Sequence, residues 1–175
     1  LGIQNGVSFS KVNCEYKIGV DPAPLCKVDY KMTSNDFFKQ NKQTFDIVFV
    51  DGLHEHSQVY LDIINSLNCL NKGGTIVCHD MNPISEYMQL IPRPNKRGPW
   101  NGDCWKALVS LSFFNPDIEY YTIDTDYGCS VITNPKNVTN LQTDSILTGY
   151  TYDKLNNNRK QILNLISVKE FKERV

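Results

Sequence analysis

The feature that most constrains the fold is an apolar, strand-like run followed by a helix-like repeat and a second apolar run. Residues 45–50 are mostly β-branched or aromatic, as expected for a central parallel strand covered on both faces. Over residues 57–70 apolar side chains recur at three- and four-residue steps, and residues 71–74 supply a glycine-containing helix end. Residues 75–78 form the second apolar run. This order of strand, helix and strand predicts an α/β fold with a parallel sheet.

Polar side chains follow both runs where each strand is expected to end. Asp51 and His54 come after the first run, and His79 and Asp80 follow the second. Because open α/β sheets bind ligands outside the carboxyl ends of their strands, these four titratable groups are expected to share one crevice. Any one of them alone would be explained as a cap of an adjacent helix. Their convergence favours a functional site.

Two glycines, Gly2 and Gly6, would let the backbone approach a ligand closely before a helix begins. The alternative is an ordinary glycine turn. Asp21 favours a ligand, because it follows another strand-like run, residues 16–20, and an acid there can accept hydrogen bonds from ribose hydroxyls. An adenine dinucleotide and S-adenosylmethionine both satisfy this arrangement.

Residues 92–103 contain three prolines and two glycines, which exclude regular structure and predict a long loop. Its basic residues, with one aromatic neighbour, could close over an anionic or sugar substrate. The alternative is a solvated basic surface. The residues concerned are Arg93, Lys96, Arg97 and Trp100.

The second half of the chain predicts the edge of the sheet and its cover. A helix from Trp105 should end at Asn115, before a proline. The runs 118–123 and 130–133 have a short connection, which indicates an antiparallel strand pair at the sheet edge. Apolar residues spaced among polar ones over 145–175 predict closing helices.

Composition limits the class of protein. The 175 residues are 41% hydrophobic and 21% charged, which suits one domain over residues 1–175. Eighteen basic against 19 acidic residues create no field that recruits nucleic acid or an anionic membrane, so the expected partner is a small molecule. No run approaches the roughly 20 apolar residues of a membrane helix. The six cysteines form no C-x-x-C pair and indicate neither zinc nor disulfides.

These observations lead us to expect a soluble, cytoplasmic protein without a signal segment. We also expect that the first strand is cut off before Leu1. The oligomeric state stays open, a homo-oligomer included.

Six segments carry a family resemblance: LGIQNGVSF from Leu1, IGVDP from Ile18, TSNDFF from Thr33, FDIVFVDGLH from Phe45, GGTIVCHD from Gly73 and DTDYGC from Asp124. Together they resemble class I S-adenosylmethionine-dependent methyltransferases, in particular the methyltransferase domain 24 group, and more distantly catechol and macrolide-sugar O-methyltransferases. The resemblance runs over nearly the whole chain. It implies a Rossmann-like fold: a mostly parallel, seven-stranded sheet of order 3-2-1-4-5-7-6, helices on both faces, and an antiparallel edge strand.

The resemblance also implies which residues bind the cofactor. The two glycines resemble the cofactor loop, the acid after residues 16–20 resembles the ribose ligand, and a Ser-Asn pair resembles the residues beside the adenine ring. The residues expected to bind S-adenosylmethionine are Gly2, Gly6, Asp21, Ser34, Asn35 and Asp51.

Metal-dependent relatives hold a divalent ion with acidic residues that end the fourth and fifth strands, positions that match Asp51, His79 and Asp80 here. His54 matches their catalytic base. Two positions depart from the pattern, because His79 stands where a carboxylate is usual and Met81 where catechol enzymes have an asparagine ligand. Magnesium prefers oxygen donors, so a His79 ligand would favour a transition metal or argue for no metal.

The expected activity is methyl transfer to a hydroxyl of a small molecule or sugar, with His54 and Asp51 as catalytic residues and a divalent metal as an optional aid. Two alternatives remain. A nicotinamide-dependent oxidoreductase shares the glycine loop and the ribose acid but normally shows G-x-G-x-x-G, which this sequence lacks. A non-catalytic module could keep the fold to bind an adenosyl ligand or a partner.

Overall fold

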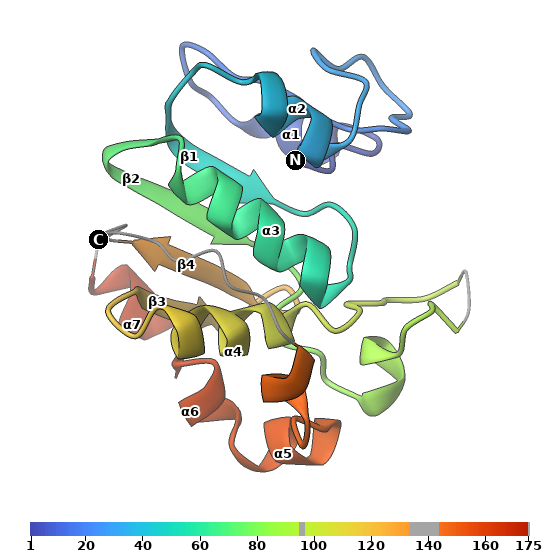
Figure 1. Cartoon of the computed structure of the whole chain (residues 1–175), viewed down its shortest axis with the longest axis vertical. Coiled ribbons are helices and arrows are strands. Elements are labelled where there is room, and N and C mark those ends of the chain that lie inside the picture. Colours follow the sequence, from blue (N-terminus) through green and yellow to red (C-terminus); the bar gives the residue numbers. More distant parts are fainter. Residues whose placement is uncertain (95–96, 134–143, 175) are drawn as a thin grey trace.

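One mixed β-sheet organises the fold (Figure 1). The computed structural model describes residues 1–94, 97–133 and 144–174. Within them the strands are β1 (Phe45–Val50), β2 (Leu70–Cys78), β3 (Glu119–Ile123), β4 (Cys129–Thr133) and β5 (Leu165–Ile166). Their order is β1-β2-β4-β3-β5, in which β1 is parallel to β2, β3 is parallel to β5, and β4 is antiparallel to both of its neighbours.

Helices precede, connect and follow these strands. The two longest, α3 and α4, contact each other and lie across one face of the sheet in Figure 1. The α-helices are α1 (Val7–Lys11), α2 (Ser34–Gln40), α3 (His56–Leu67), α4 (Trp105–Phe114), α5 (Tyr152–Asn157), α6 (Arg159–Ile162) and α7 (Val168–Lys172). Two short 3₁₀ helices are η1 (Glu86–Gln89) and η2 (Asp144–Leu147).

The main core lies between the sheet and the pair α3 and α4. Val48 and Val50 of β1 and Ile76 of β2 pack there with Ile63 of α3 and Trp105 of α4, all buried. Alternation along β1 directs every second side chain to this face. The strand, helix, strand unit predicted from the sequence is therefore confirmed, and it supplies nine of the 20 buried residues of this core.

The opposite face is covered only in part, so the expectation that β1 is covered on both faces is wrong. Ile47 and Phe49 alternate with the buried valines and remain 67% and 40% exposed. Farther along the same face, Ile123, Val131 and Ile166 form a small separate cluster against Phe171 of α7. Among the described residues, the contact with α7 is what covers apolar side chains on this face of the sheet.

The predicted seven-stranded, mostly parallel sheet is wrong, since the described residues form five strands and two of the four pairings are antiparallel. Residues 16–20 make no regular strand. Instead Val20 bridges Tyr30 in parallel, and its carbonyl accepts a hydrogen bond of 2.9 Å from the amide of Gly2. The carbonyl of Leu1 in turn accepts from the amide of Asp51. The segments at Tyr30, Val20 and Leu1 thus follow one another toward β1, which is the order that the resemblance implies for strands 3, 2 and 1 beside strand 4. None of these contacts extends over enough residues to form a regular strand pair.

Two predicted boundaries also change. The helix ends at Leu67 instead of residue 70, and residues 71–74 belong to β2, where the register with β1 shifts between Phe45 and Ile47. Gly73, with φ +81°, adopts the left-handed conformation within this irregular part of β2 and does not end a helix.

At the other edge, the antiparallel pair β3 and β4 is confirmed, but it is not outermost. The two-residue β5, which interrupts the closing helices α5–α7, pairs in parallel with β3. None of the described helices has the length and apolarity needed to cross a bilayer.

Candidate functional site

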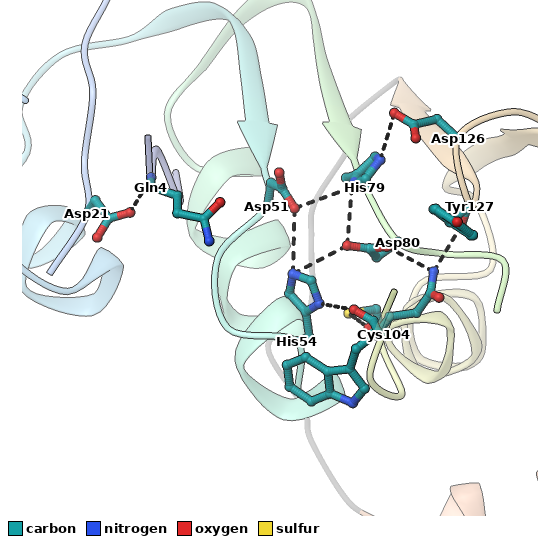
Figure 2. A network of polar contacts seen from close by, with 11 residues as sticks. Gln4, Asp21, Asp51, His54, His79, Asp80, Cys104, Asp126 and Tyr127 are labelled. Carbon is teal, nitrogen blue, oxygen red and sulfur yellow. Dashed lines mark hydrogen bonds and ion pairs between the residues drawn. The ribbon is translucent and has the colours of Figure 1, made fainter. Parts of the chain in front are cut away.

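The four strand-end residues meet at the carboxyl edge of β1 and β2. Val50 pairs with Cys78 in parallel register, and the His79 amide donates to the Val50 carbonyl at 3.0 Å, so Asp51 and His79 leave the sheet side by side. Figure 2 shows the side chains of Asp51, His54, His79 and Asp80 directed toward one another. We call these four residues the crevice cluster. The convergence predicted from parallel pairing is confirmed.

Three members of this cluster could hold a cation. His54 Nε2 lies 3.3 Å from Asp80 Oδ2 and 3.7 Å from Asp51 Oδ1. One ligand atom from each residue lies within 4.8 Å of the other two, so the three atoms could face a single ion. The triad expected from the sequence contained His79 in place of His54. In the described residues the structure brings His54 into this group.

The loop before α4 fixes the His54 ring. Its Nδ1 lies 2.9 Å from the Trp100 carbonyl, and the indole stacks on the imidazole with centroids 5.1 Å apart and planes at 17°. A carbonyl only accepts hydrogen bonds, so Nδ1 must carry a hydrogen. In the neutral ring the lone pair therefore lies on Nε2, facing the two carboxylates.

This arrangement favours a positive charge, either a proton or a cation, between His54 and its carboxylates. Burial lowers the pKa of His54, but Asp51, Asp80 and the Trp100 carbonyl outweigh it and raise that pKa above its ordinary value. For Asp51, burial raises the pKa, and contacts with His54 and His79 outweigh this and hold the pKa below its usual range. An Nε2 lone pair facing two carboxylates without a positive charge between them would be repulsive.

His79 lies against the same carboxylates from the other side. Its Nδ1 is 3.4 Å from Asp51 Oδ1 and 3.2 Å from Asp80 Oδ2, and its Nε2 is 3.2 Å from Asp126 Oδ2. Contacts with Asp51 and Asp80 outweigh burial and raise the pKa of His79 to about 11. A pKa raised this far favours the imidazolium form at neutral pH, and an imidazolium offers no lone pair to a metal.

Asp80 is oriented by a residue that the sequence analysis missed. The buried Asn101 donates from Nδ2 to Asp80 Oδ1 at 2.9 Å and to the Tyr127 carbonyl at 3.3 Å. This leaves Asp80 Oδ2 to face the two histidines. Asp80 itself has φ +62°, in the left-handed region that aspartate tolerates better than most residues. Asn101 lies in the proline-rich loop, where no periodicity marks a buried side chain.

The glycine loop abuts the crevice cluster. A Cβ on Gly2, which has φ +75°, would lie 1.8 Å from the Asp51 carbonyl oxygen, so only glycine fits there. Gly6 also has φ +75°, and a Cβ on it would lie 2.7 Å from Cys26 Sγ. The close approach that the glycines permit in this structure is to the protein's own chain.

Asp21 lies on the opposite side of Asp51 from His79, next to Gln4 (Figure 2). Its two carboxylate oxygens accept backbone hydrogen bonds, Oδ2 from Gln4 at 2.8 Å and Oδ1 from Ala23 at 2.7 Å. Each oxygen has a second acceptor position, which a ribose hydroxyl could use. Asp21 thus closes the loop and keeps the capacity expected of a ribose ligand.

The expected adenine-side residues, Ser34 and Asn35, begin α2 and contact α3. Gln58 Nε2 lies 3.1 Å from Asn35 Oδ1, 3.3 Å from Ser34 Oγ and 2.9 Å from Asp62 Oδ1. A Cβ on Gly52 would lie 3.7 Å from Asp62 Oδ2, which places this group close to the residue that follows Asp51 of the crevice cluster. We call Ser34, Asn35, Gln58 and Asp62 the amide cluster. Sequence reasoning missed Gln58 and Asp62.

The basic loop has less contact with this site than a closed lid would have. Arg93 is exposed, with Cζ 5.4 Å from the centre of the Trp100 ring and Nη2 2.8 Å from the Gly98 carbonyl. Arg97 is also exposed, and Lys96 lies outside the described residues. Trp100 thus connects the loop to His54, whereas the two described arginines fit the solvated-surface interpretation.

Comparison with known proteins finds a family match over the part of the chain that contains these clusters. A search of curated proteins finds no match to this sequence. The family model described as a methyltransferase domain matches residues 28–81, a span that contains both the crevice cluster and the amide cluster. The resemblance to methyltransferase domains that the sequence indicates is thereby confirmed over this span, and a domain of this type implies S-adenosylmethionine-dependent methyl transfer.

Proposed function

We propose that the protein transfers the methyl group of S-adenosylmethionine to a hydroxyl of a small molecule or sugar. The observation that carries the proposal is the crevice cluster, in which His54 Nε2 faces Asp51 and Asp80 and is fixed there by the Trp100 carbonyl. The combination of a fixed imidazole and two carboxylates is suited to removing and holding a proton. A hydroxyl group is a weak nucleophile until its proton is removed, so a methyl acceptor of this kind benefits from a nearby base.

The proposed cofactor seat runs from the glycine loop to the amide cluster. Asp21 offers carboxylate oxygens to ribose hydroxyls, and Ser34 with Asn35 supplies polar groups for the adenine ring. The bound cofactor supplies a sulfonium methyl that is already electrophilic. The chain therefore has to orient an acceptor oxygen in line with that methyl and exclude competing nucleophiles.

His54 is the proposed base. In its neutral form Nε2 accepts the hydroxyl proton, and Asp51 and Asp80 stabilise the imidazolium that results. Trp100 holds the ring during this change, because the Nδ1 hydrogen stays bonded to its carbonyl. His79, positively charged at neutral pH, offsets part of the negative charge of the same two carboxylates.

The residues also fit a divalent cation. Ligand–ligand separations of 3.3 and 3.7 Å agree with donors arranged around one ion at about 2.0–2.2 Å from each. Asp51, His54 and Asp80 would hold it, and a donor set with an imidazole suits zinc, manganese or another transition metal better than magnesium. Such an ion would occupy the Nε2 lone pair of His54 and would therefore replace His54 as the group that activates the acceptor hydroxyl, by lowering the pKa of that hydroxyl and orienting it.

A thermal-shift panel tests this function. S-adenosylmethionine, S-adenosylhomocysteine and NAD are each added with EDTA, magnesium, manganese or zinc, because a ligand that binds only the native state raises its melting temperature. We expect both adenosyl ligands to stabilise the protein and NAD to have no effect. Stabilisation by NAD alone would support an oxidoreductase instead. A protein that binds the cofactor but transfers no labelled methyl group to any hydroxyl acceptor would be a binding module.

The same panel tests the cation site. Stabilisation by manganese or zinc that is lost in Asp51→Asn and Asp80→Asn would place the ion in the crevice cluster. Equal stabilisation of these variants would place it elsewhere.

A further inference from the structure

We propose that Gln58 is a positioning residue that fixes the orientation of the Asn35 carboxamide and thereby selects adenine as the base of the cofactor. The inference rests on the proposed function and adds to it a residue and a specificity. It is carried by the hydrogen-bond directions within the amide cluster, which joins α2 to α3.

The carboxamides of Gln58 and Asn35 face each other in a reciprocal pair. Gln58 Nε2 donates to Asn35 Oδ1 at 3.1 Å, and Asn35 Nδ2 donates to Gln58 Oε1 at 3.2 Å. Such a pair could form equally well with both amides rotated by half a turn, because each side chain has a donor end and an acceptor end. A third group is needed to select one of the two arrangements.

Asp62 is that group. It lies one helical turn after Gln58 on α3, is only 1% exposed, and accepts from Gln58 Nε2 at 2.9 Å. A carboxylate has no hydrogen to donate, so the nitrogen end of Gln58 must point toward it. Burial raises the pKa of Asp62, and hydrogen bonds from Ser34 and Gln58 oppose that shift. A buried acceptor left without these donors would cost free energy.

The orientation of the Gln58 carboxamide then determines the orientation of the Asn35 carboxamide. With its nitrogen directed at Asp62, Gln58 can offer Asn35 its second N–H and its oxygen only in the observed order. Asn35 is left with one N–H and one oxygen lone pair for a ligand, at positions that cannot exchange. A free carboxamide can rotate to suit either of two bases, whereas this one cannot.

Adenine and hypoxanthine differ in the feature that a fixed carboxamide distinguishes. Adenine has an amino donor beside the N1 acceptor, and hypoxanthine has a carbonyl acceptor beside an N1 donor. A fixed Asn35 amide can match only one of these edges, and the mismatched base leaves polar groups unpaired. We therefore infer that the amide cluster rejects the inosyl analogue of the cofactor.

The alternative role for Gln58 is purely structural, as a link between α2 and α3. The two roles differ in one measurable quantity, the ratio of affinities for the adenine and hypoxanthine ligands. Loss of a structural link would weaken both ligands alike. Loss of orientation would reduce the ratio, because Asn35 could then rotate toward either base.

The experiment is calorimetric titration of S-adenosylhomocysteine and S-inosylhomocysteine into wild type, Asp62→Asn, Gln58→Met and the control Gln43→Met. Asp62→Asn is nearly isosteric and keeps a hydrogen-bonding partner for Gln58, but it is uncharged and can donate as well as accept, so it no longer dictates which end of Gln58 faces it. Gln58→Met removes the link itself. Gln43 is exposed, and within the described part of the chain its hydrogen bonds are made by its backbone, to Asn41.

We expect wild type and Gln43→Met to prefer the adenosyl ligand, and both cluster variants to lose at least about tenfold of that preference. A preference unchanged in Asp62→Asn and Gln58→Met, with wild type still binding S-adenosylhomocysteine, would overturn the role of Gln58 and leave the proposed function intact. Wild type that binds neither ligand would overturn both.

Discussion

The crevice cluster and the amide cluster meet near Gly52, which follows Asp51 in the chain and lies close to Asp62, and they use similar groups for different purposes. Both contain buried acidic side chains. In the crevice cluster, Asp51 and Asp80 face two imidazoles, whose protonation changes with pH. In the amide cluster, Asp62 faces a carboxamide and a hydroxyl, which do not titrate near neutral pH.

The difference teaches which part of the site can vary during a reaction. A proton or cation can enter and leave the crevice cluster, because the negative charge of its carboxylates can be offset either by protonated imidazoles or by a bound cation. In the amide cluster only one arrangement of donors and acceptors is possible while Asp62 is ionised. We therefore assign bond making to the first cluster and ligand selection to the second.

Gly102→Ala should have the largest effect on the crevice side. Gly102 has φ +61°, and a Cβ there would lie 1.7 Å from the His54 carbonyl oxygen. Gly98→Ala is the matched control, since Gly98 has φ +90° but open space around it. Urea denaturation should show a loss of about 3 kcal/mol for Gly102→Ala and about 1 kcal/mol for the control. Equal losses would mean that the loop is not held against His54.

His54→Ala should separate the two clusters by function. Removal of the base is expected to lower methyl-transfer turnover by about 100-fold or more, because general base catalysis contributes that much. Affinity for S-adenosylhomocysteine should stay within about twofold, because the amide cluster is intact. Unchanged turnover would refute the base assignment, and a parallel loss of affinity would refute the division of labour.

His79→Gln should change how stability depends on pH. The pKa of His79 is raised to about 11, so its stabilising contribution is fully present below its unfolded value near 6.5 and is lost as pH rises toward 11. In EDTA, the difference in free energy of unfolding between wild type and variant should shrink by about 2 kcal/mol from pH 7 to pH 9. A difference that stays constant over this range would show that His79 is not an imidazolium in the fold.

Thr33→Ala tests the amide side with the smallest change. Thr33 caps α2 by accepting from the Asp36 amide at 3.1 Å, directly before Ser34 and Asn35. Loss of the cap should cost about 1 kcal/mol and lower the melting temperature by about 2–4 °C, with Thr33→Ser restoring both. Turnover at saturating cofactor should not change. A fall in turnover as large as that of His54→Ala would break the distinction between the clusters.

The fold was predictable where periodicity is long and failed where elements are short. The repeat that became α3 and the run that became β1 span two or more turns or several pleats, so tertiary context did not override them. The two-residue β5 pairs with β3 at only two positions, and Val20 pairs with Tyr30 at only one. No local pattern distinguishes such contacts from a loop.

The site divides in the same way. Asp51, His54, His79 and Asp80 were predictable because parallel strands bring their carboxyl ends together. Gln58 and Asp62 were not, because polar residues on an amphipathic helix are ordinarily placed in solvent. One signal was available, since Gln58 and Asp62 are spaced by four residues and Asp62 immediately precedes the buried Ile63. The Trp100 carbonyl is a backbone group, which no side-chain pattern reveals.

Amide chemical-shift mapping with S-adenosylhomocysteine tests the central claim most directly, that a cofactor binds across both clusters at the carboxyl edge of the sheet. The account predicts saturable shifts at the amides of residues 2–6, Asp21, residues 34–35 and residues 51–52. The amides of residues 71–73, at the opposite end of β2, should not move. No shifts at a saturating concentration, or shifts confined to the opposite edge, would contradict the account.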